Sequence, residues 1–193
     1  MIRLKRAHLV SAARSHPGRS GKQNEDRFAI AAYRVSALDP TPAVFAVVAD
    51  GIGGHRSGEL AAEMAVEHLG WVVGRSDGFE PLATLDQGVR AASQLIARKA
   101  NEDEKYAGMG TTCACAWVIG LRLYIAAVGD SRIYLVRDHA IRQLTTDHTW
   151  IQEALEKGID VKGGHETSGR LVRPRLGVHR GEVVPEGAGG GCP

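Results

Sequence analysis

The sequence has few cysteines, almost no net charge and no long apolar run. Three cysteines in 193 residues are too sparse for a disulfide framework, so we expect a reducing, cytoplasmic location. A formal net charge of +2, without a basic stripe interleaved with aromatic residues, argues against a nucleic-acid partner. No apolar segment is long enough to span a membrane, and Arg14 and His16 interrupt any signal-peptide core. We therefore expect one monomeric domain that makes no membrane contact.

Hydrophobic periodicity and the positions of glycines predict strands and helices that do not alternate as βαβ units. Strands are expected at 7–14, 27–35, 43–49, 112–119, 121–128, 131–137 and 141–144. Helices are expected at 58–73 and 81–105. Two helices placed between groups of strands favour an α+β fold with an antiparallel sheet.

The most informative segment is Asp50-Gly51-Ile52-Gly53-Gly54-His55, which follows the apolar strand expected at 43–49. A carboxylate at the end of a buried strand is costly unless a metal ion or hydrogen-bond donors stabilise it. The glycines allow the backbone to bend sharply and to approach an ion or a phosphate. A hard divalent cation such as Mg²⁺ or Mn²⁺ suits oxygen ligands of this kind. The alternative is a strand-to-helix turn that merely needs glycine.

Four further blocks accompany this segment. They are Asn24-Glu25-Asp26-Arg27, Gly110-Thr111-Thr112, Val128-Gly129-Asp130-Ser131-Arg132-Ile133-Tyr134 and Leu144-Thr145-Thr146-Asp147-His148-Thr149. In order and spacing the five blocks resemble the metal-dependent protein phosphatases of the 2C type (PPM family), in their bacterial form. The resemblance implies a phosphatase domain at residues 7–178 and an irregular glycine-rich tail at 179–193. It also implies two central antiparallel β-sheets sandwiched by helices.

The resemblance further implies a site for two Mn²⁺ or Mg²⁺ ions, with a third, looser position in a complete family member. Asp50 would bridge two ions, and the Gly51 carbonyl would be a further ligand. Asp26 would hold a metal-bound water with Glu25 beside it, so both would belong to the metal site, and Asp26 and Asp50 are the expected catalytic residues. Asp130 would belong to the third position. For each carboxylate the alternative is a cap on a turn.

The expected phosphate-binding residues surround Gly21, where the family usually carries an arginine. Arg19 and Lys22 flank this position. A lysine supplies positive charge but no bidentate fork, so weaker phosphate binding is a hypothesis. His55 follows the glycines, where it could touch a metal-bound water or cap the next helix.

Other conspicuous residues are expected to have structural roles. Cys113 and Cys115 share one face of a strand, which is more typical of small core residues than of a zinc site. Gly110-Thr111-Thr112 is expected to pack next to the site, where it begins a strand. Arg132 is expected to pair with a carboxylate or to face solvent.

The tail differs most from the family pattern, because residues 179–193 contain no aspartate where further metal ligands are expected. Two ligands and the last strands of a sheet are therefore expected to be missing, which would leave open edges and exposed apolar surface.

Two functions follow from these observations. The first is a serine/threonine protein phosphatase that uses a metal-activated water on phosphorylated proteins, the products of a Ser/Thr kinase. The second is a catalytically impaired remnant or binding module on the same scaffold. A generic phosphate-ester hydrolase of the P-loop kind is disfavoured, because the glycine-rich loop lacks the Gly-Lys-Ser/Thr ending.

Overall fold

A six-stranded antiparallel sheet forms the centre of the molecule, in the order β1-β2-β3-β6-β7-β10. The computed structural model describes residues 1–19, 23–53, 57–147 and 181–183. The sheet strands are β1 (Ile2–Leu4), β2 (Arg27–Arg34), β3 (Pro42–Ala49), β6 (Cys113–Ile119), β7 (Arg122–Val128) and β10 (Gly181–Val183). Two short ribbons pair β4 (Gly51–Ile52) with β5 (Gly110–Thr111) and β8 (Tyr134–Arg137) with β9 (Ala140–Gln143).

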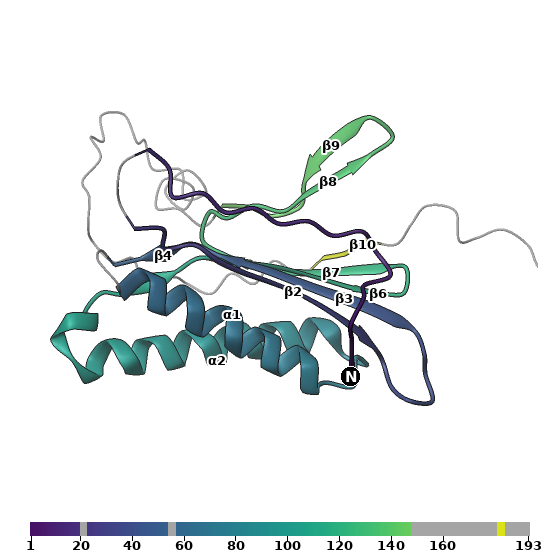
Figure 1. Cartoon of the computed structure of the whole chain (residues 1–193), viewed down its shortest axis with the longest axis horizontal. Helices are drawn as coiled ribbons and strands as arrows, with labels where there is room; N and C mark the ends of the chain where they lie inside the picture. Colours follow the sequence, from purple (N-terminus) through teal and green to yellow (C-terminus); the bar gives the residue numbers. More distant parts are fainter. Residues whose placement is uncertain (20–22, 54–56, 148–180, 184–193) are drawn as a thin grey trace, which may run out of the picture.

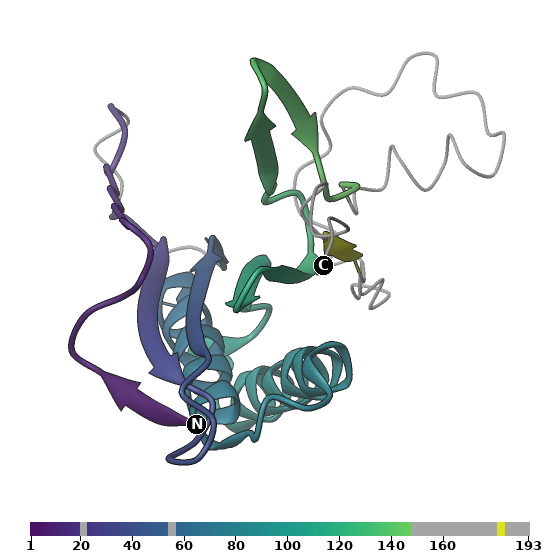
Figure 2. The ribbon, with the colours of Figure 1, turned by 90° about the vertical axis from the view of Figure 1, so that its right-hand side faces the viewer.

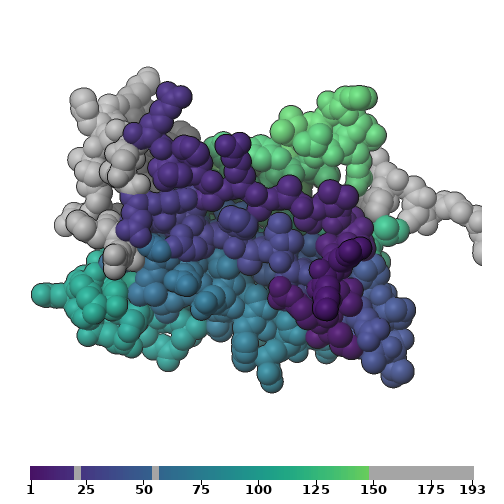
Figure 3. All heavy atoms as spheres, viewed as in Figure 1, coloured from purple at the N-terminus to yellow at the C-terminus, as the bar shows by residue number. Residues whose placement is uncertain are grey.

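Two helices, α1 (Ser57–Arg75) and α2 (Pro81–Glu102), cover one face of the sheet (Figures 1 and 2). The β8–β9 hairpin stands on the other side of the sheet, and the N-terminal segment runs along the face turned towards the viewer in Figure 3, at a distance from that hairpin in Figure 2. None of the described helices is long and apolar enough to cross a membrane. The α+β class and the antiparallel sheet predicted from the sequence are confirmed.

The core lies between the sheet and the helices. Alternate residues of each strand point towards the helices, as the period of a strand requires. The largest fully buried side chains include Phe45 and Val47 of β3, Trp117 of β6, and Leu69 and Leu85 of the two helices. Cys113 and Cys115 also belong to this core, as expected, and both are free thiols.

The helices present apolar stripes that match the predicted periodicity. In α1 the buried stripe includes residues four apart: Ala61, Ala65, Leu69 and Val73. In α2 it includes Leu85, Val89, Ala92 and Ile96. The helices meet closely at Gly88, because a Cβ atom there would lie 3.0 Å from Cδ2 of Leu69.

Three predicted elements differ from the structure, and one of them, the strand expected at 131–137, begins only at Tyr134. The strand expected at 7–14 does not form, because residues 8–14 are exposed and bury no apolar face; Ile2–Leu4 pairs with β2 instead, opposite Ala32–Arg34. The second helix ends at Glu102, earlier than the expected 105. Asp103 adopts an extended backbone, and its carboxylate accepts a hydrogen bond from the Lys105 N–H (3.0 Å), which starts a short 3₁₀ turn at Glu104–Tyr106 instead.

Adjacent valines of β3 test which face of this strand contributes more to stability. Val47 faces the helices and is 1% exposed, whereas Val48 faces the other way and is 50% exposed. Val47→Ala should lower the free energy of unfolding by about 2 kcal/mol, because it removes two buried carbons and leaves a cavity. Val48→Ala should cost less than about 1 kcal/mol. Urea unfolding measures both, and equal losses would contradict the one-sided core.

Candidate metal centre

Four chain segments meet in one row across the end of the sheet, and the strand register places them there. Arg27 pairs with Ala49, so the next residues in that ladder are Asp26 and Asp50. Val48 pairs with Ala114, which brings Asp50 to the start of β6. Cys113 pairs with Val128, which brings the residues after β7 to the same edge. The row therefore contains the carboxylates of three blocks that are far apart in the sequence.

The backbone of Asp50 is fixed by two threonines. Its N–H donates a hydrogen bond to Oγ1 of Thr112 (3.0 Å), and its carbonyl oxygen accepts from the Thr112 N–H (2.9 Å). The same carbonyl oxygen accepts from Oγ1 of Thr111 (2.9 Å). The expectation that Gly110-Thr111-Thr112 packs beside the site is thus confirmed, and the threonine hydroxyls also anchor the main chain of Asp50.

Gly51 and Gly58 allow three pieces of backbone to approach one another. A Cβ atom on Gly51 would lie 2.1 Å from the Gly58 carbonyl oxygen and 2.9 Å from the Glu25 carbonyl oxygen. A Cβ atom on Gly58 would lie 2.3 Å from Oε2 of Glu25. Any larger residue at either position would separate these segments. The Glu25 carboxylate consequently lies against the first turn of α1, where the helix dipole favours a negative charge.

A polar clamp holds the segment that contains Asp26. The Asp26 N–H donates to Oδ1 of Asn24 (3.0 Å), and its carbonyl oxygen accepts from Nη1 of Arg27 (2.7 Å). Arg27 also forms an ion pair with Glu59, and the Gln23 amide donates to the other oxygen of that carboxylate. Glu59 belongs to the first turn of α1, so the clamp ties the Asp26 segment to the helix.

Asp130 is placed by the turn that follows β7. Gly129 has a φ of 91°, and a Cβ atom on it would lie 2.8 Å from Cγ2 of Thr112, so this position requires glycine. The next residue, Ser131, shares a hydrogen bond of 2.6 Å with the Thr112 hydroxyl. Thr112 therefore links the main chain of Asp50 to the loop that carries Asp130.

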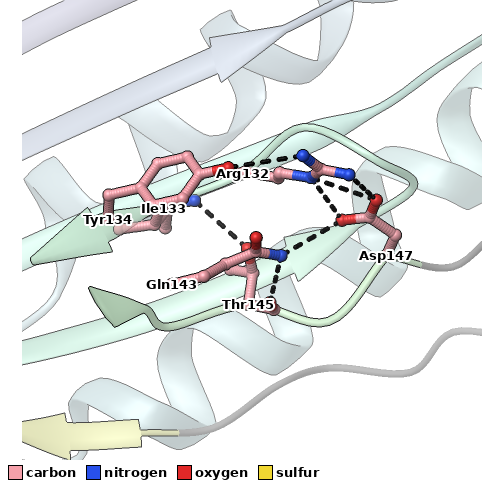
Figure 4. A network of polar contacts seen from close by, with 6 residues as sticks. All are labelled: Arg132, Ile133, Tyr134, Gln143, Thr145 and Asp147. Atoms are coloured by element: carbon pink, nitrogen blue, oxygen red, sulfur yellow. Dashed lines mark hydrogen bonds and ion pairs between the residues drawn. The ribbon is translucent and has the colours of Figure 1, made fainter. Parts of the chain in front are cut away.

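The loop after Asp130 is closed by an arginine network (Figure 4). Nε of Arg132 lies 2.9 and 3.0 Å from the two carboxylate oxygens of Asp147, and Nη2 lies 2.5 Å from one of them. The Gln143 amide donates to the Thr145 carbonyl oxygen (2.8 Å), and the Ile133 N–H donates to Oγ1 of Thr145 (3.1 Å). Of the two roles considered for Arg132, the structure thus shows the carboxylate pair.

The electrostatics of the site centre on Asp50. Partial burial raises the pKa of its carboxyl group above the ordinary 3.8, and the neighbouring carboxylates of Asp26, Asp130 and Glu25 raise it further. Asp50 nevertheless remains open to solvent, so the crowding of like charges is the feature that a bound cation would relieve.

The donor set fits a hard divalent cation in its chemistry, because it consists of carboxylate and carbonyl oxygens. Within the described ranges, however, no three His, Cys, Asp or Glu side chains form a closed metal-binding group. The carboxyl groups of Asp26 and Asp50 lie within hydrogen-bonding distance of each other, and water molecules would complete the coordination of an ion held there, as they commonly do for Mg²⁺.

The predicted phosphate-binding residues are not brought to the site by the described residues. Arg19 is exposed and makes no hydrogen bond or ion pair with any other described residue. Lys22 and His55 lie outside the described residues. Sequence reasoning missed Glu59, whose only local signal is its place in the first turn of a predicted helix. It also assigned no role to Ser131.

Comparisons with known proteins agree with this geometry. The family profile described as "Protein phosphatase 2C" matches residues 14–155, well over half of the chain. The chain belongs to the protein phosphatase 2C family. Among relatives, the serine/threonine protein phosphatase PstP of Mycobacterium tuberculosis is 37% identical over 150 residues, which are 78% of this chain and 27% of that protein. The chain thus spans about a quarter of the length of this relative.

Solved structures show the same phosphatase 2C fold. The S. agalactiae serine/threonine phosphatase superimposes with a TM-score of 0.66 at 27% identity, covering 87% of this chain and 70% of that one. The catalytic domain of PstP, solved in complex with two manganese ions, gives a TM-score of 0.56 at 31% identity, covering 71% and 62%. The phosphatase 2C fold predicted from the resemblance is thereby confirmed; where two central sheets were expected, the described residues form one six-stranded sheet and two short ribbons.

Substitution of Thr112 tests whether its hydroxyl positions Asp50. Thr112→Val removes the acceptor of the Asp50 N–H and the partner of Ser131, and should cost about 1–3 kcal/mol of unfolding free energy. Thr112→Ser keeps the oxygen and should cost about 1 kcal/mol. Mn²⁺ affinity, measured by calorimetry, should fall by about tenfold or more for the valine variant and by less for serine. Equal losses of Mn²⁺ affinity would mean that the hydroxyl group matters no more than the methyl group, which would contradict its role in positioning Asp50.

Neutralising Asp50 should stabilise the metal-free protein. A carboxylate whose pKa is raised by folding opposes folding at every pH above that raised value, and the effect fades as the pH falls towards 3.8. In EDTA at neutral pH, Asp50→Asn should therefore raise the melting temperature by about 1–2 °C, a small effect because Asp50 is open to solvent.

Thermal unfolding followed by circular dichroism over a range of pH measures this effect. Glu63→Gln, at an exposed position of α1 outside the carboxylate cluster, serves as the control and should change the melting temperature by less than about 0.5 °C. A lower melting temperature for Asp50→Asn at neutral pH would mean that like-charge crowding does not dominate the site.

Proposed function

We propose that this chain carries the metal centre of a serine/threonine protein phosphatase, which hydrolyses phosphoserine and phosphothreonine in proteins. The observation that carries this proposal is the place of Asp50 at the end of a buried strand, with Asp26, Glu25 and Asp130 around it. Its family membership supports the proposal, as does the similarity to PstP, a named serine/threonine phosphatase whose catalytic domain has been solved with two manganese ions.

The proposed ligands follow the arrangement of the site. Asp50 and the Gly51 carbonyl would hold two Mn²⁺ or Mg²⁺ ions, and Asp130 would contribute to a third position. Bound ions of this kind lower the pKa of water and neutralise charge on phosphoryl oxygens. Asp26 would accept a hydrogen bond from the attacking water at its carboxylate, and Glu25 would orient the first turn of α1 beside it. The phosphatase domain, predicted at 7–178 with an irregular tail at 179–193, would extend to β1 and β10, because both strands pair in the central sheet.

The proposed substrates are proteins phosphorylated by a Ser/Thr kinase. Arg19 and Lys22 would supply positive charge for the phosphate in place of the arginine that Gly21 replaces, with His55 nearby. The monomeric state and the cytoplasmic location stay predictions from the sequence.

Hydrolysis of para-nitrophenyl phosphate and of a phosphothreonine peptide by the purified 193-residue chain tests the proposal. The rate should depend on added Mn²⁺ and should fall by about a hundredfold or more in Asp50→Asn, because the site loses its central carboxylate. Glu63→Gln should retain the wild-type rate within about twofold. A folded wild-type chain without Mn²⁺-dependent hydrolysis would contradict the proposed function.

A further inference from the structure

A cavity of about 630 Å³ lies between the helix pair and the end of the sheet next to the metal centre. Its walls come from α1, α2, the segment before β5, and strands β5 to β7. Most of the lining is apolar and includes Leu69, Val89, Ile96, Met109, Cys113 and Val128. The cavity opens beside α2, where Ala97 both lines it and is exposed.

The chemistry of the lining limits what the cavity can hold. None of the residues that line it carries a charge, and its polar side chains are those of Ser93, Asn101, Thr111 and the Cys113 thiol. A hydrogen bond with Cys115, followed by burial, raises the pKa of that thiol, so Cys113 stays neutral. Burying a charged group among such residues would be costly. The volume falls in the range of about 300–1,000 Å³ that is typical of small-molecule sites.

One wall of the cavity is also the support of the metal centre. Gly110 and Thr111 line the cavity, and they form the strand that pairs with Gly51 and Ile52. Oγ1 of Thr111 donates to the Asp50 carbonyl oxygen (2.9 Å). A molecule that shifted this strand would therefore shift the main chain of Asp50.

A second contact joins the cavity to the loop after Asp50. Met109 lines the cavity and packs on its other side against Gly53, where a Cβ atom would lie 3.1 Å from the Met109 Cα atom. The contact is made by the Cα and Cβ atoms of Met109, so a molecule in the cavity that displaced the main chain of Met109 would press on Gly53.

We propose that this cavity binds a small, uncharged and mainly apolar molecule with a single hydrogen-bonding group, and that binding changes the affinity of the Asp50 centre for divalent metal. The binding itself does not depend on the proposed phosphatase activity, whereas the coupling rests on the proposed metal centre. Because coupling between two sites is reciprocal, metal binding must change the affinity of the cavity by the same factor.

Fluorescence titration with N-phenyl-1-naphthylamine, an uncharged apolar probe, tests the binding. The wild-type chain should show saturable binding. Ala97→Phe places a ring at the opening and should weaken binding by about tenfold or more, whereas Gln94→Phe adds the same ring to an exposed position of α2 outside the cavity and should change it by less than about twofold. No saturable binding, or equal effects of the two variants, would overturn the proposal.

Calorimetric titration with Mn²⁺, with and without saturating probe, tests the coupling. The Mn²⁺ dissociation constant should change by about fivefold or more when the probe is bound, and Ala97→Phe should reduce this change. An unchanged constant despite probe binding would overturn the coupling. Absence of Mn²⁺ binding in a chain that does bind the probe would count against the proposed metal centre and not against the cavity.

Discussion

The repulsion among carboxylates at the end of β3 is the constraint around which this part of the molecule is built. Asp50, Asp26, Asp130 and Glu25 would separate if nothing held them; partial burial and, after it, the proximity of these carboxylates raise the pKa of Asp50. Hydrogen bonds from the backbone and from threonine hydroxyls hold the strand end instead. Apart from the Arg27–Glu59 ion pair that ties the Asp26 segment to α1, the groups that hold these charges together are neutral, at a cost in stability that a bound cation would offset.

The packing of the core determines where these carboxylates lie. Phe45 and Val47 must face the helices to be buried, and this fixes the register of β3 against β2 and β6. A slip by one residue would turn both side chains to the opposite face. The same slip would move Asp50 away from Asp26. Selection for a packed core and selection for a site therefore act on the same pairing, although the residues involved differ.

Sequence patterns could predict the parts of this arrangement that are local. The apolar strand ending in Asp50, the amphipathic helices and the strands around Gly120 each carry a periodic signal, and they appear within a few residues of the expected bounds. The strand predicted at 7–14 does not form, because residues 8–14 stay exposed while Ile2–Leu4 pairs with β2, an outcome that depends on contacts between distant segments. The Arg27–Glu59 ion pair and the Thr112–Ser131 hydrogen bond join residues that are far apart in the chain, so no local sequence pattern predicts them.

The sequence allowed two interpretations of the glycines after Asp50. They could form a turn, or they could allow the backbone to approach an ion. The contacts of Gly51 and Gly58 show that these interpretations do not exclude each other. Their missing Cβ atoms let the end of β3 pack against the start of α1, which is the requirement of a turn. That same packing brings Glu25 against α1 and keeps the Gly51 carbonyl beside Asp50, which is the requirement of a site. A side chain at either glycine would therefore disturb the turn and the carboxylate cluster together, because one contact serves both.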